Sequence, residues 1–238
     1  MRLSRFFIDV PLSLGQHPLP DAPAHYISRV LRLSAGSAVQ LFDGSGSEFR
    51  GELLEVGKKS VAVELHERLT GMPESPLQIH LGQGLSRGER MDWAIQKATE
   101  LGVTQITPII SERCEVRLND ERADKRLAHW RQIAISACEQ CGRSVLPVIH
   151  PPISLRDWLP VEADLKLVLH PVAAPLTSHA RPQTLAFLIG PEGGLSESEV
   201  EQAANQGFQP ARLGPRVLRT ETAPVVALSV AQQLWGDF

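Results

Sequence analysis

The sequence predicts an α/β protein in which a small β domain precedes a larger domain built on a mostly parallel sheet. Up to about residue 70, short alternating strands are separated by turn residues. After residue 76, apolar runs of strand length alternate with amphipathic helices, and this order favours a parallel sheet covered on both faces. A glycine and two prolines lie between these parts. We therefore expect a β domain over residues 1–70, a linker over 71–76 and an α/β domain over 77–238.

The elements of the expected β domain follow from strand length and turn spacing. Strands are predicted over residues 38–44, 48–56 and 60–65, and one short helix over 22–31. This composition is typical of a compact barrel.

The expected α/β domain shows the alternation of strands and helices. The helix over residues 90–101 places apolar side chains at steps of three and four, and Gly102 follows where a helix end favours glycine. Ser196 and Glu199 have the spacing of a capping box and predict a helix start. The other strands are expected over 77–81, 103–110, 165–169, 185–189 and 211–213, and the other helices over 120–140 and around 225–234.

Composition indicates an ordinary soluble globular protein, with 42% hydrophobic and 21% charged residues in 238. No apolar run approaches the ~18 residues of a membrane span, and the N-terminus lacks a secretory pattern, so we expect no membrane association and a cytoplasmic location. The net charge of −3 gives no support for nucleic-acid binding, although a local basic patch remains compatible with it. Cys138 and Cys141 lie in a predicted helix without a second ligand pair, so we expect partly buried thiols and no metal site.

Two glycine-marked loops near the C-terminal end form the most informative pattern. Residues 190–194, Gly-Pro-Glu-Gly-Gly, follow an apolar strand, and residues 213–223 contain a second loop, Leu-Gly-Pro-Arg-Val-Leu-Arg-Thr-Glu-Thr-Ala. Glycine lets backbone approach a ligand closely because it has no Cβ. Two such loops about twenty residues apart predict one ligand held between strand ends. Neither loop matches a dinucleotide, P-loop or serine-nucleophile motif. Backbone amides beside apolar side chains suit an adenine or another flat ring.

The paired loops resemble those of the SPOUT methyltransferases, and within them the RsmE family, which methylates N3 of a uridine in 16S ribosomal RNA. Other segments resemble the same family across the whole chain: residues 5–7, 25–32, 96–103 and 139–147. The resemblance implies S-adenosylmethionine as cofactor, a deep C-terminal trefoil knot, a homodimer, and a PUA-like barrel that binds RNA in the 30S subunit. By this resemblance the cofactor-binding residues are His170, Ile189, Gly190, Pro191, Glu192, Gly193, Gly194, Leu213, Gly214, Val217, Leu218 and Ala223.

Methyl transfer to uracil N3 requires removal of its proton and alignment of nucleophile, methyl and sulfur. We predict that Arg219 positions or stabilises the uracil oxygens, because a guanidinium fork matches their planar edge. Glu221 or Glu192 is expected to take the proton. The alternative is that both carboxylates only bond loop amides or cap the following helix.

Basic and stacking residues are expected to contact ribosomal RNA, although each is individually typical of a solvated surface. The predicted set is Arg5, His25, Arg29, Arg32, Arg87 and Lys97. Two other functions remain open: a SPOUT enzyme acting on a ribose 2′-hydroxyl or on tRNA, and a non-catalytic RNA-binding assembly factor. Trp130 and Trp235 are predicted to be core residues.

Overall fold

The computed structural model describes residues 3–57, 60–116, 119–176 and 179–238. These residues form two compact units, each with its own core. The first contains residues 1–74 and 138–146, and the second contains 75–137 and 147–238. Among the described residues, no helix is both long and apolar enough to cross a membrane.

The first unit is a five-stranded sheet with a short helical segment. Its strands have the order β1-β3-β4-β5-β2, with β1 parallel to β3 and the other pairs antiparallel. Ala24 and Ile27 of the helical segment are buried with strand residues such as Leu41 and Leu53. The elements are β1 (Ser4–Phe7), β2 (Gly15–Pro18), α1 (Asp21–His25), the π-helical turn η1 (Tyr26–Val30), β3 (Ala38–Phe42), β4 (Ser47–Val56) and β5 (Val61–Thr70).

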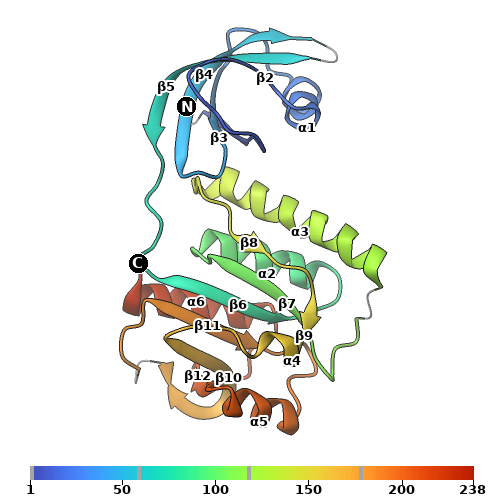
Figure 1. Ribbon diagram of the computed structural model, residues 1–238, viewed down its shortest axis with the longest axis vertical. Helices are drawn as coiled ribbons and strands as arrows, with labels where there is room; N and C mark the ends of the chain where they lie inside the picture. Colours follow the sequence, from blue (N-terminus) through green and yellow to red (C-terminus); the bar gives the residue numbers. More distant parts are fainter. Residues whose placement is uncertain (1–2, 58–59, 117–118, 177–178) are drawn as a thin grey trace. The chain divides into compact units, whose positions relative to one another are not determined.

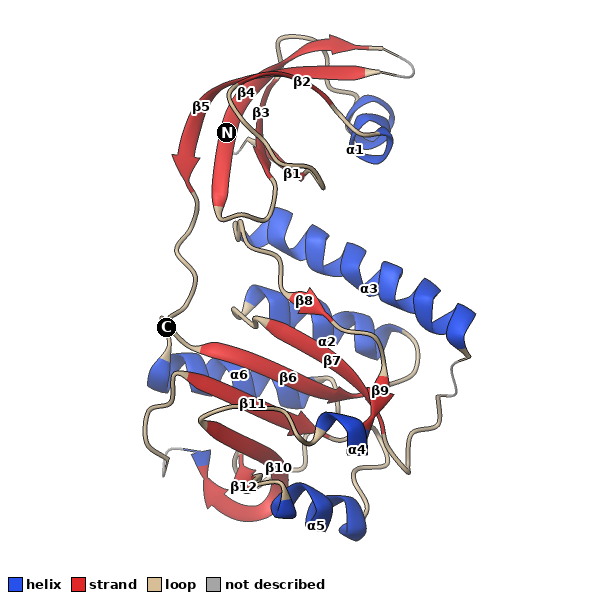
Figure 2. Ribbon diagram, in the orientation of Figure 1, coloured by secondary structure: helices blue, strands red, loops and turns tan. Residues whose placement is uncertain are grey.

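The second unit has a wholly parallel sheet, with the order β12-β10-β11-β6-β7-β8 and β9 paired to β7 (Figure 1). The sheet strands are β6 (Gln78–Gly84), β7 (Gln105–Ile110), β8 (Val148–Ile149), β9 (Ile153–Ser154), β10 (Leu165–Pro175), β11 (Thr184–Ile189) and β12 (Gln209–Arg212). The helices are α2 (Glu89–Glu100), α3 (Asp120–Cys141), α4 (Leu155–Trp158), α5 (Glu197–Asn205) and α6 (Thr222–Trp235) (Figure 2).

Helices cover both faces of this sheet because successive strand residues point to opposite sides. On β11, Leu185, Phe187 and Ile189 pack into the cluster that includes buried residues of α2, α3 and α6. The intervening Ala186 and Leu188 pack with α4 and α5. The predicted α/β class is therefore confirmed, and Trp130 and Trp235 are buried in the first of these clusters as expected.

Several expected boundaries differ from the structure. Short elements such as β8, β9 and α4 carry too few residues to show a period, so they were not predicted from the sequence, and neither were β1 and β2. Residues 138–146 lie in the first unit, whereas we had expected them in the α/β domain. The reason is a set of long-range bonds: Arg5 Nη1 donates to the carbonyl oxygen of Cys138 at 2.8 Å, and the Phe7 amide donates to the Glu139 carboxylate at 3.0 Å.

Candidate active site

The first glycine loop, residues 190–194, connects the carboxyl end of β11 to α5. Gly194 has φ +69°, a conformation that side chains disfavour, and its amide donates to the Pro191 carbonyl at 2.8 Å. Ser196 then caps α5, accepting from the Glu199 amide, while the Glu199 carboxylate accepts from the Ser196 amide. The predicted capping box is confirmed, and it fixes where the loop ends and the helix begins.

The second loop runs from β12 to α6. Gly214 has φ +100°. The amides of Thr222 and Ala223 donate to the Arg219 carbonyl at 2.9 Å, and these bonds close the turn that begins α6. Glu221 occupies the N-cap position of α6, but its side chain makes no capping bond. The alternative role of Glu221 as a helix cap is therefore not seen.

Both loops are joined to each other and to the end of β6. The Thr220 hydroxyl donates to the Gly190 carbonyl at 2.8 Å and accepts from the side-chain amide of Gln83 at 3.1 Å. Thr220 and Gln83 are buried. A Cβ on Gly84 would lie 2.5 Å from the backbone carbon of Gly190, so only glycine allows the first loop this close to β6.

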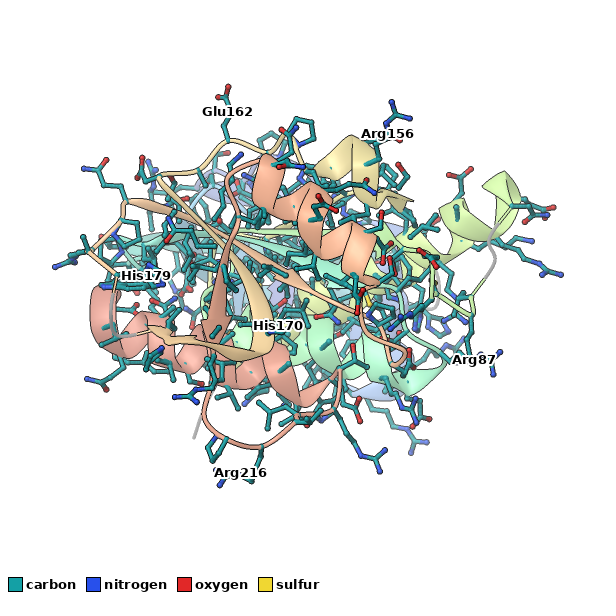
Figure 3. The ribbon with its side chains drawn as sticks, turned by 90° about the horizontal axis from the view of Figure 1, so that it is seen from below. Arg87, Arg156, Glu162, His170, His179 and Arg216 are labelled. Atoms are coloured by element: carbon teal, nitrogen blue, oxygen red, sulfur yellow. The ribbon has the colours of Figure 1, made fainter. Side chains whose placement is uncertain are left out.

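The two loops, with Leu169 and His170 of β10, line a cavity of about 890 Å³. Because β12, β10 and β11 are adjacent and parallel, their carboxyl ends and following loops meet at one edge of the sheet. His170, on β10, is part of the wall, whereas Arg216 points outward from the second loop (Figure 3). The cavity is lined by every residue that we predicted as catalytic or cofactor-binding: His170, Ile189, Gly190, Pro191, Glu192, Gly193, Gly194, Leu213, Gly214, Val217, Leu218, Arg219, Glu221 and Ala223.

Part of the lining was not predicted from the sequence. The additional residues are Arg90, Leu169, Leu195, Glu197, Val200, Ala211, Arg212, Arg216 and Thr220. Most of them lie close in the sequence to residues that we predicted to bind the cofactor. Arg90 is different, because it comes from the first turn of α2, 79 residues before Leu169, the next lining residue along the chain. Its position shortly after the carboxyl end of β6 is the signal that could have identified it, since that edge of a parallel sheet is where ligands bind.

Charged groups from three segments meet at this cavity. Arg90 Nη1 lies 2.8 Å from Glu192 Oε1, and Arg90 Nε lies 4.0 Å from Glu221 Oε1. The Arg87 amide also donates to Glu192, at 3.2 Å. Partial burial works against the charged form of Glu192, but hydrogen bonds from its own amide, Arg90 and the Arg87 amide outweigh it, so the pKa of this carboxyl lies below its ordinary value. The Glu192 carboxylate is therefore ionised at neutral pH.

The residues predicted to bind RNA have different environments. His25, Arg29 and Arg32 are exposed on and just after the helical segment of the first unit. In the second unit, Arg87 is exposed and pairs with Glu115 at 3.1 Å, and Lys97 pairs with Glu100 at 2.8 Å.

Arg5 corrects one prediction. Its side chain is only 6% exposed, pairs with Glu48 and lies over the Phe42 ring, 4.7 Å from its centroid. Its Nη1 donates to the Cys138 carbonyl and its Nη2 to Glu48, both within the first unit, so Arg5 is a structural residue there and no phosphate contact is expected from it.

The cysteines have the environment that we expected. Cys138 is buried, and Cys114 and Cys141 are partly exposed. Burial, the largest cause, raises the pKa of the Cys138 thiol to about 12, so this side chain is an unreactive core thiol.

The fold and the site together define a class: an α/β protein with a cavity of small-molecule size, formed by two linked glycine loops at the carboxyl edge of a parallel sheet. The model of the RNA methyltransferase domain matches residues 73–232, and that of the RNA methyltransferase PUA domain matches residues 19–65. The chain belongs to this RNA methyltransferase family, among the relatives called ribosomal RNA small subunit methyltransferase E. The expected family is thereby confirmed.

The relatives extend over the full chain. The ribosomal RNA small subunit methyltransferase E of Buchnera aphidicola (strain APS) is 35% identical, over 100% of this chain and 96% of the relative. The Bacillus subtilis protein of the same name is 32% identical over 95% of each chain. The crystal structure of the Neisseria gonorrhoeae protein of this name, bound to S-adenosyl methionine, has a TM-score of 0.94 and 42% identity over 100% of both chains. A Legionella pneumophila protein in complex with SAM has a TM-score of 0.98 and 40% identity, also over both entire chains.

Proposed function

We propose that the protein transfers the methyl group of S-adenosylmethionine to N3 of a uridine in 16S ribosomal RNA of the small subunit. The observation that carries the proposal is the cavity between the two glycine loops, in a chain whose full length matches ribosomal RNA small subunit methyltransferase E relatives.

The cavity fits the cofactor in size and chemistry. Its volume of about 890 Å³ lies within the range of small-molecule sites. Apolar side chains including Leu169, Ile189, Leu213 and Leu218 supply walls for the adenine ring, and the glycine loops supply backbone groups for its polar edge. Carboxylates at the same cavity complement the positive charges of the sulfonium and the amino group. The bound cofactor supplies an electrophilic methyl group.

The chain's own residues provide the rest of the chemistry. Arg219 is exposed at the cavity edge, and in the described part of the chain its guanidinium makes no ion pair. It is available to bind the uracil oxygens, on which negative charge develops when N3 loses its proton. Glu221, beside it in the loop, takes that proton. Arg219 and Glu221 are the proposed catalytic residues.

The remaining expectations form part of the same proposal. Residues 1–70 act as a PUA-like RNA-binding domain, joined by residues 71–76 to the methyltransferase domain, whose C-terminal part forms a trefoil knot. His25, Arg29 and Arg32 on the first domain, with Arg87 and Lys97 on the second, contact RNA of the 30S subunit. The protein works in the cytoplasm as a homodimer. Exposed Trp93 and Leu234, on helices α2 and α6 that pack together, support a subunit contact on the second domain.

The test is methylation of 30S subunits that lack the modification, with labelled cofactor and identification of the modified base. We expect 3-methyluridine in 16S RNA, strongly reduced transfer by Arg219→Ala and Glu221→Ala, and unchanged transfer by Arg156→Gln, an exposed control outside the cavity (Figure 3). If the protein binds the cofactor but the label enters only tRNA or a ribose 2′-hydroxyl, that acceptor is the substrate in place of uridine N3 of 16S RNA. Absence of cofactor binding would favour a non-catalytic RNA-binding factor.

A further inference from the structure

The guanidinium of Arg90 joins three segments at the cavity. Arg90 lies in the first turn of α2, Glu192 in the first glycine loop and Glu221 in the second. Its Nη1 donates to Glu192 at 2.8 Å, and its Nε is 4.0 Å from Glu221. The Arg90 side chain is 42% exposed, so it lies at the cavity mouth and not in the core.

The two carboxylates near Arg90 differ in the hydrogen bonds that they accept. Glu192 Oε1 accepts hydrogen bonds from Arg90 and from the Arg87 amide, and its pKa is lowered. Protonating Glu192 would break these bonds, which makes it a weak proton acceptor. Glu221 is less exposed, at 20% against 31%, yet its only described contact is the longer ion pair with Arg90. Its oxygens remain available to a substrate in the cavity.

We infer that Arg90 is the positioning residue that makes Glu221, and not Glu192, the proton acceptor. It holds Glu192 as an anchor of the first loop and directs the Glu221 carboxylate into the cavity without occupying its oxygens. This inference rests on the proposed function and identifies the base within it.

The resulting step is balanced in atoms and charge. The uracil N3–H proton goes to a carboxylate oxygen of Glu221, and the electron pair left on N3 forms the bond to the methyl carbon. The methyl–sulfur bond breaks, and its electron pair stays on sulfur, which thereby becomes a neutral thioether.

The arrangement requires arginine specifically. A guanidinium presents N–H groups in several directions within one plane, so one side chain contacts carboxylates from two loops. A lysine ammonium is a compact point charge on a flexible stem and does not hold both in a fixed geometry. We therefore expect Arg90→Lys to restore less than half of the activity lost in Arg90→Gln.

The experiment measures single-turnover methylation of unmodified 30S subunits, together with cofactor Kd in the absence of RNA. The variants are Arg90→Gln, Glu192→Gln and Glu221→Gln, with Arg156→Gln as the matched control. The titratable and charged side chains around the cavity are Arg90, His170, Glu192, Glu197, Arg212, Arg216, Arg219 and Glu221.

Glu221→Gln should reduce the rate by about 10²–10⁴-fold while cofactor Kd changes little, because general base catalysis contributes that much. Glu192→Gln should reduce the rate by less than about tenfold, since it removes no proton acceptor. Arg90→Gln should slow methyl transfer while cofactor Kd changes little, because the Glu221 carboxylate loses the cation that holds it in position. A purely structural role would weaken cofactor binding together with the rate, since the same loops line the cofactor cavity.

A large loss in Glu192→Gln with an active Glu221→Gln would overturn the inference, and so would an Arg90→Gln variant whose rate is unchanged or whose cofactor affinity falls as much as its rate. If these results occur while the wild type methylates 30S subunits, the inference alone fails. If the wild type binds cofactor but transfers no methyl to 30S subunits, the proposed function fails and the inference falls with it.

Discussion

The side-chain hydroxyl of Thr220 donates a hydrogen bond of 2.8 Å to the backbone carbonyl oxygen of Gly190. This bond connects the second glycine loop to the first. The side-chain amide of Gln83, at the end of β6, donates to the same hydroxyl and connects both loops to the sheet. Because Thr220 stands between Arg219 and Glu221, it fixes the backbone from which both proposed catalytic side chains project.

Replacing Thr220 with valine keeps the shape but removes the hydroxyl. We expect a loss of about 1–3 kcal/mol in the free energy of unfolding, because the Gly190 carbonyl and the Gln83 amide lose a buried partner. Cofactor affinity should fall as well, as the loops lose their fixed spacing. Denaturant unfolding and calorimetric titration measure the two effects. Thr220→Ser keeps the hydroxyl and should stay close to wild type in affinity; equal losses in both variants would contradict the role of the hydrogen bond.

A methyl group at Gly84 should damage the site through the backbone. The added Cβ would lie 2.5 Å from the Gly190 carbonyl carbon, and neither backbone segment can yield without moving the first loop. We expect Gly84→Ala to lower both thermal stability and cofactor affinity. Gly82→Ala is the matched control on the same strand: its Cβ would meet the Trp158 ring at 2.5 Å, away from the cavity. That variant should be destabilised but bind cofactor normally, and weak binding by it would contradict the prediction.

Stability should fall in mild acid because of His80. Burial, with a smaller contribution from His150, lowers the pKa of His80 from 6.5 to about 4. Its Nε2 lies 2.8 Å from the Thr107 hydroxyl oxygen and accepts from the Trp158 indole N–H at 3.3 Å, so the folded protein favours the neutral ring. The unfolded chain binds a proton first, so this contribution to stability is complete above pH 6.5 and falls by about 3 kcal/mol between pH 6.5 and 4.

Urea unfolding between pH 8 and 4 tests this dependence. His80→Gln should lose most of the change between pH 6.5 and 4, whereas His66→Gln, an exposed control in the first unit, should keep it. Equal pH dependence in wild type and His80→Gln would assign the acid sensitivity to other groups.

Arg5 provides a test of its corrected role. Arg5→Met leaves the Glu48 carboxylate, 8% exposed, without its counter-charge. We expect a loss of about 3–5 kcal/mol in the free energy of unfolding, and a partial recovery when Glu48→Gln is added. Both are measured by chemical unfolding. If Arg5→Met instead kept full stability and lost only RNA affinity, the original expectation of a phosphate contact would be restored.

The sequence by itself determined the elements that depend on residues close together in the chain. The capping box at Ser196 and Glu199 defined the start of α5, and the three- and four-residue steps over 90–101 defined α2, because both patterns depend on residues one turn apart. The glycine loops and their order along the chain also predicted one edge of a parallel sheet as the site. The family resemblance extended these local patterns to a cofactor and a substrate.

Only the tertiary structure decided which distant residues meet. Gln83 and Thr220 are 137 residues apart, and Arg90 and Glu192 are 102 apart, so no periodicity in the sequence links them. Arg5 shows the converse: a basic residue near the N-terminus gave no local sign of burial, and its carboxylate partner lies 43 residues away. Burial and ion pairing depend on the packing of whole elements, and that information exists only after the chain has folded.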